Sequence, residues 1–159
     1  MNENTQVINI GYKGEVTLSI YHGDTKVKTI NTHNEGKQPL FTYLAHCLAG
    51  DFVPSMVPSY LRIFDEDEHE VTYSAVPSTT LVNYDSSESQ AYVIVTFNVS
   101  STAFDSSEKV KTFKLYSRDN RSLSSGDNPS AIFSLSDALE VASGVNLVVA
   151  WKMIIGNFN

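Results

Sequence analysis

The segment GVNLVVAWKMIIGNFN, residues 144–159, is the most apolar part of the chain and holds its only tryptophan. In a strand, alternate side chains point to opposite faces. One face of this segment would then be wholly apolar, with Val145, Leu147, Val149, Trp151, Met153 and Ile155. The other face would be only half polar, with Asn146, Val148, Ala150, Lys152 and Ile154. We expect such a strand to be covered on both faces, by another part of the chain or by a neighbouring copy.

The same alternation predicts further strands along the chain. Residues 14–21 (GEVTLSIY) and 25–30 (TKVKTI) flank the turn residues His22-Gly23-Asp24, which predicts a β-hairpin. In residues 130–144, two interpretations stay open, a strand through Ile132 and Phe133 or a helical turn capped by Ser136. The remaining predicted strands are YLRIF (60–64), TTLVNY (79–84), QAYVIVTFNVS (90–100) and KVKTFKLYS (109–117).

One helix is predicted near residues 39–49. Pro39 suits a first helical turn and Gly50 suits the position after the helix end. Cys47 falls on the apolar side, where we expect a small buried residue. The apolar residues at helical spacing are Leu40, Phe41, Leu44, Cys47 and Leu48.

About eight strands with one early helix and no alternation of strands and helices predict a mainly β protein. The expected architecture is an antiparallel β-sandwich or barrel with one short α-helix. The length of 159 residues and the 42% of hydrophobic residues fit one β-sandwich-like domain over residues 1–159.

Composition narrows the classes of partner. The net charge of −7 argues against nucleic acid, because phosphate binding needs clustered Lys and Arg. The single cysteine rules out an internal disulfide and paired-cysteine zinc sites. Apolar runs stay well below the roughly twenty residues that span a membrane, and the N-terminus does not resemble a secretory signal. We expect a soluble chain, made in a cytoplasm, that binds neither nucleic acid nor membranes.

The motifs that would indicate catalysis or metal binding are absent from the sequence. The acidic run 65–70 (DEDEHE) fails the calcium-loop pattern, which leaves a solvated hairpin tip or a looser divalent-ion site as alternatives. His46 and Cys47 are adjacent and would point about 100° apart on a helix, so they cannot form a dyad. Nucleophile elbows and glycine-rich nucleotide loops do not occur. The sequence predicts no enzyme, no catalytic residue, no metal site and no cofactor.

Three stretches together resemble small structural proteins of tailed bacteriophages, most closely those of short-tailed phages of the crAss-like group. The first is YKGEVTLSIYHGDTKVKTINTHNEGKQPLFTYLAHCLAGDF (12–52), with its hairpin and its H-N-x-G loop entering a helix that ends C-L-A-G. PSYLRIFD (58–65) follows, and VNLVVAWKMIIGNF (145–158) contributes a final strand carrying V-x-W.

The resemblance implies a β-rich virion building block without a reaction of its own. Such a protein is used in many copies as a head-decoration, head-fibre, neck or tail component. It is made in the host cytoplasm and binds other copies of itself and other phage structural proteins. The missing signal sequence and the single cysteine agree with assembly in a reducing cytoplasm.

The half-apolar second face of the last strand predicts where copies would meet. A homo-oligomer held through this face would use Val148, Ala150 and Ile154, with Phe158 beyond them. As an alternative, the chain covers both faces itself. A carbohydrate- or host-receptor-binding β-module, acting through loops 117–130 and 65–70, is the second functional class, and a small hydrolase is the third.

Overall fold

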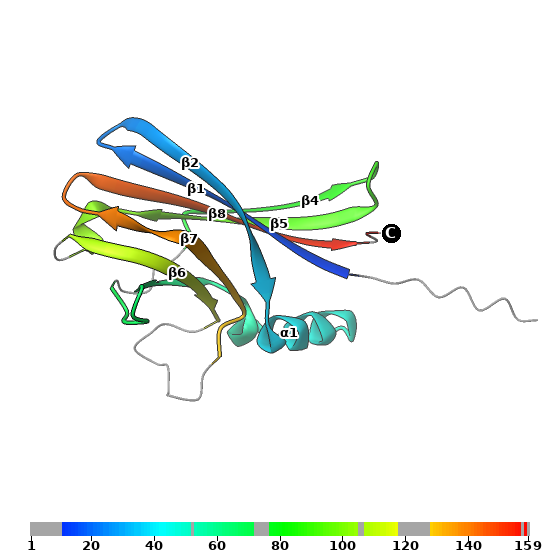
Figure 1. Cartoon of the computed structure of the whole chain (residues 1–159). Helices are drawn as coiled ribbons and strands as arrows, with labels where there is room; N and C mark the ends of the chain where they lie inside the picture. Colours follow the sequence, from blue (N-terminus) through cyan, green and yellow to red (C-terminus); the bar gives the residue numbers. More distant parts are fainter. Residues whose placement is uncertain are drawn as a thin grey trace, which may run out of the picture.

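The structure is a computed structural model that describes residues 11–51, 53–71, 77–104, 107–117, 128–156 and 158. Its strands are all antiparallel and its one α-helix follows the first hairpin, as predicted (Figure 1). The elements in chain order are β1 (Gly11–His22), β2 (Thr25–Gly36), α1 (Gln38–Leu48), η1 (Pro54–Met56), β3 (Tyr60–Asp65), β4 (Thr79–Asp85), β5 (Gln90–Val99), η2 (Ser101–Ala103), β6 (Glu108–Tyr116), β7 (Ala131–Val141) and β8 (Val145–Gly156).

The eight strands form one curled sheet in the order β3-β6-β7-β2-β1-β8-β5-β4. Between β2 and β7 the ladder is very short, since it pairs only Glu35 with Ile132 and Gly36 with Ala131. This seam divides the sheet into a long half (β2-β1-β8-β5-β4) and a short half (β3-β6-β7). The short half folds under one end of the long half and α1 lies under the other end, which gives a half-barrel (Figure 1).

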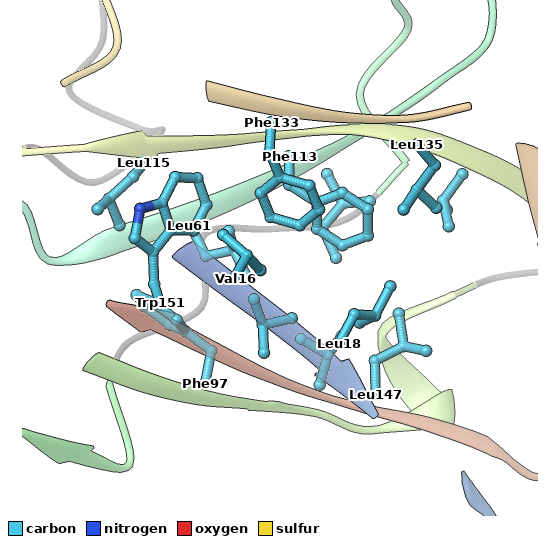
Figure 2. Packing of buried hydrophobic residues seen from close by; sticks show 14 of the residues in the cluster. Val16, Leu18, Leu61, Phe97, Phe113, Leu115, Phe133, Leu135, Leu147 and Trp151 are labelled. Carbon is cyan, nitrogen blue, oxygen red and sulfur yellow. The ribbon is translucent and has the colours of Figure 1, made fainter. Parts of the chain in front are cut away.

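The core fills the space between the two halves. One face of the long half contributes Val16, Leu18, Phe97 and Leu147 to the core (Figure 2). The short half contributes Leu61, Phe113 and Leu135, which pack against them. Phe113 and Phe133 stack with ring centroids 4.5 Å apart, and Phe133 meets Trp151 edge-on at 5.1 Å. Trp151 is fully buried in this cluster, so the apolar face predicted for the last strand is indeed the core face.

A polar contact fixes Trp151 in the core. With the Asn34 amide oriented so that its oxygen faces the N–H donors, the oxygen accepts hydrogen bonds from Trp151 Nε1 at 2.9 Å and from the Glu15 backbone N–H at 3.2 Å. The amide nitrogen then donates to Tyr12 Oη at 2.6 Å. Asn34 lies directly over Gly14, its partner across the β1–β2 ladder, where a Cβ would overlap the amide. The indole N–H is therefore satisfied inside the core, as buried donors require.

Residues 130–144, which the sequence left open, are strand rather than helix. β7 continues to Val141, because its second half pairs with the start of β6, where Glu108 faces Val141 and Val110 faces Leu139. The register shifts between the pairs Val110–Leu139 and Thr112–Ser134, so residues 135–138 of β7 form an irregular stretch between two paired segments. Cross-strand pairing therefore overrides the local helical tendency.

Helix α1 lies where it was predicted, but Cys47 is not buried as expected. Leu40 in the first turn is buried and Leu44 is half-buried, whereas Cys47 is exposed and Leu48 is 86% exposed. The helix therefore packs against the sheet at its start and diverges from it towards its end. Cys47 lies on the side of the helix that we expected, but at a turn that the sheet no longer covers.

The contact between Gly14 and Asn34 can be tested by a double-mutant cycle. Gly14→Ala should lower the free energy of unfolding by about 1–3 kcal/mol through overpacking. Asn34→Ala should cost about 1–3 kcal/mol, because Trp151 Nε1, the Glu15 backbone N–H and Tyr12 Oη lose their partner. In the double variant the clash is gone, so its cost should fall short of the sum by at least about 0.5 kcal/mol. Denaturant unfolding measures all three, and additive costs would contradict the contact.

Candidate association surface

The outer face of the long half, opposite the core, carries the residues predicted to contact other copies. Val148 and Ala150 of β8 are half-buried there. Ala150 lies between Thr17 of β1 and Thr96 of β5 in the two ladders, so the middle of this face is built from short side chains. The location of both residues agrees with the prediction. Their contact with another copy stays a prediction.

Ile154 lies on the same outer face, where it was predicted to contact another copy, but the single chain already buries it. The side chain is only 4% exposed. Its cross-strand neighbours are Lys13 on β1 and Tyr92 on β5, and directly opposed side chains in a sheet lie about 5 Å apart. Two long side chains therefore flank a residue of the central strand and leave it little contact with solvent, without any second subunit.

Phe158 is 41% exposed and lies beside the end of the β1–β8 ladder. Its ring approaches Gly11 so closely that a Cβ added there would lie 2.9 Å from Cδ2. Gly11 faces Gly156 across the ladder, and the missing side chain of Gly11 leaves the room that the ring occupies. Phe158 thus presents one part of its ring to its own sheet and another to solvent. Its predicted role as an anchor for another copy stays a prediction.

Sequence reasoning missed the free edge of β4. This strand is exposed along its length except at Asp85, and its large apolar side chains face solvent, with Val82 76% and Tyr84 62% exposed. Leu81 is exposed on the outer face, whereas Val82 and Tyr84 lie on the inner face beside Val93 and Ala91 of β5. Within the described part of the chain, only β5 pairs with β4. The available signal was TTLVNY itself, whose adjacent Leu81 and Val82 make both faces apolar.

The other open edges carry features that discourage pairing with another chain. Beyond the seam, β2 and β7 diverge around a groove lined by Lys28 and Asp137, and β2 also exposes Lys26. The edge of β3 is covered by its own loop, since Val71 N–H donates to the Ile63 carbonyl at 2.9 Å. Charged side chains and covering loops are the usual protection of sheet edges. β4 has neither a lysine nor a proline.

An apolar pocket of about 320 Å³ opens beside β4. It lies between α1 and the inner faces of β4, β5 and β8. Thr80 and Val82 of β4 form part of its lining, so the pocket reaches the strand that has the free edge. Its other walls include Tyr12, Leu40, Tyr43, Leu44, Pro58, Val93, Met153 and Ile155.

The acidic loop 65–70 folds back onto β3 and β6. Glu70 forms an ion pair with Arg62, and Glu68 binds Lys114 at 3.0 Å. Both cations lie over the Phe64 ring, at 5.3 Å for the Arg62 guanidinium and 4.3 Å for Lys114 Nζ. Two of the five acidic side chains thus pair with nearby cations, while residues 66–70 stay exposed, in agreement with the predicted solvated tip.

The looser divalent-ion alternative has a geometric counterpart in the same loop. Asp65, Asp67 and His69 can each place one ligand atom within 4.8 Å of the others. Asp65 Oδ1, however, already accepts hydrogen bonds from the backbone N–H groups of Asp67 at 2.9 Å and His69 at 2.8 Å. These bonds build the turn itself, so the arrangement is accounted for as a structural turn.

The remaining sequence predictions concern His46, loop 117–130 and membranes. His46 Nδ1 lies 3.0 Å from Asp51 Oδ2 on the surface. Residues 118–127 of the second predicted recognition loop lie outside the described residues. None of the helices in the described ranges has the length and apolarity that crossing a membrane requires. Comparisons with protein-family models, with curated proteins and with solved structures find no match to this chain.

Burial predicts different roles for two residues of β8. Ile154→Ala should lower the free energy of unfolding by about 2 kcal/mol or more, because it empties a buried site. Val148→Ala, at a half-buried position, should cost about 1 kcal/mol or less. Equilibrium unfolding in denaturant compares the two variants. Small and nearly equal losses in the free energy of unfolding, together with weaker assembly of the Ile154 variant, would instead support a subunit contact at Ile154.

The turn built on Asp65 predicts a pH effect. The backbone N–H of His69, followed by that of Asp67, holds the pKa of the Asp65 carboxyl below its ordinary 3.8. The stabilisation is therefore present above the ordinary pKa and is lost as pH falls through the lowered folded pKa. A carboxyl-carbon NMR titration should give a midpoint below 3.8, and the chain in urea gives the unfolded control. A folded midpoint at or above the control value would contradict the turn.

Proposed function

We propose that this protein is a non-enzymatic structural subunit of a tailed-phage virion that acts by assembling in many copies. It serves as a head-decoration, head-fibre, neck or tail component, and is made in the host cytoplasm before assembly. Its partners are other copies of itself and other structural proteins of the particle.

The observation that carries this proposal is the edge of β4 with which no other described strand pairs. A free edge presents a row of backbone N–H and C=O groups that another strand can satisfy. Natural proteins usually block such an edge, and here the other open edges are charged or covered, while β4 exposes Leu81, Val82 and Tyr84. An edge of this kind suits a protein that functions by binding other copies of itself.

Two further features support the proposal. Residues 12–52, 58–65 and 145–158 carry the resemblance to phage structural proteins, and they form the first hairpin with α1, the strand β3 and the central strand β8. The outer face around Ala150, with its short side chains, adds a second surface on which a lattice neighbour can lie. Repeated subunits need more than one contact when they build an extended assembly.

The mass of the purified chain in solution tests the proposal. Light scattering across a wide concentration range should give a mass that rises from one chain to a defined multiple, because a symmetric contact saturates at a fixed copy number. A mass of one chain at every concentration, combined with retention on glycans or host cells, would contradict the proposal and favour a binding module.

A further inference from the structure

We propose that two copies of this chain join edge to edge through β4, antiparallel and centred on Val82, with Tyr84 of each copy covering the apolar pocket of the other. This inference rests on the proposed function, since it names the partner and the contact by which copies meet. The strand and the pocket belong to the single chain, and the register between the two copies is what we infer.

The backbone identifies the occupant as a strand. β4 pairs through one edge with β5 over its whole length, from Thr79–Thr96 to Asp85–Gln90, which leaves the other edge without a partner among the described residues. A neighbouring β-strand satisfies such groups with regular geometry, which a helix or a small molecule cannot do. Apolar side chains on both faces of β4 would leave water in the same step.

The sequence of β4 favours a second copy as the source of that strand. Thr79–Asp85 has Val82 at its centre, so an antiparallel pair with Val82 opposite Val82 aligns all seven residues. The single charged residue, Asp85, then faces Thr79 instead of another Asp85, so no like charges oppose each other. The strand is therefore complementary to itself about a two-fold axis, as an isologous contact requires.

The pocket explains how an aromatic anchor would fit this register. An antiparallel pair in one sheet keeps both inner faces on the same side, so Tyr84 of one copy stands opposite the partner's Thr80. Thr80 and Val82 are part of the lining of the apolar pocket between α1 and the sheet. The Tyr84 ring, 62% exposed in the single chain, would thus lie at the mouth of that pocket. Buried aromatic side chains dominate the free energy of many interfaces.

The first test changes Val82, whose side chain is exposed, so that the variant still folds. Val82→Lys places a charge at the centre of the free edge, at a position that is 76% exposed, so the chain should keep its melting temperature. Its association should weaken at least tenfold, measured by sedimentation equilibrium. Val27→Lys is the matched control, because Val27 is also an exposed valine but lies on β2. The control should assemble like the unchanged chain.

Cross-linking tests the register. Cys47 is exposed and is first replaced by serine. In this background, Val82→Cys should give a dimer with a short thiol-to-thiol cross-linker, because the two thiols would lie opposite each other. Leu81→Cys should cross-link several-fold less, since Leu81 would face the partner's Asn83. Preferential cross-linking of Leu81→Cys would overturn the proposed register.

The outcomes separate this inference from the proposed function. An unchanged chain that forms oligomers, with a Val82→Lys variant that forms the same oligomers, would overturn the β4 contact and leave multi-copy assembly in place. An unchanged chain that stays a single copy would overturn the β4 contact, and combined with retention on glycans or host cells it would contradict the proposed function as well. Loss of association in Val82→Lys alone, with the Val27→Lys control intact, would support both.

Discussion

The burial of Trp151 is the constraint on which the rest of the structure depends. The indole ring fills the space between the two halves of the sheet, but its N–H can be buried only if an acceptor lies inside. Asn34 supplies that acceptor from β2, and Gly14 supplies the room for Asn34 on β1. Three neighbouring strands, β2, β1 and β8, are thereby held in one register. Burial also raises the pKa of Tyr12, the third member of this polar cluster, so its hydroxyl stays protonated as a partner of Asn34.

The curl of the sheet follows from the way these strands meet the short half. Phe133 contacts Trp151 and stacks on Phe113, so the aromatic cluster draws β7 and β6 beneath β8. The ladder between β2 and β7 can then be only two residue pairs long, because the strands diverge as the sheet turns over. A sheet that curls without closing keeps its edges. The half-barrel therefore creates the open edge of β4 as a consequence of how it buries its core.

Elements with a strong local pattern were predictable from the sequence. The hairpin at Gly23, the strand character of residues 145–155 and the helix after Pro39 all depend on neighbours close in the chain. The errors occurred where distant residues decide the outcome. Cys47 has helical spacing with Leu40, yet the last turn of α1, which carries Cys47 and Leu48, is exposed. Ile154 has the alternation of an outward residue, yet Lys13 and Tyr92 flank it on both sides.

The association surface shows the same division. The sequence by itself determined that the chain is mainly β, that β8 is apolar on one face and that Leu81 and Val82 make β4 apolar on both, since these are properties of alternation along a single segment. Only the tertiary structure decided that β8 is central and β4 is at the edge. Strand order depends on pairings between residues far apart in the sequence, and an apolar strand has the same pattern whether its neighbours cover it or leave it open.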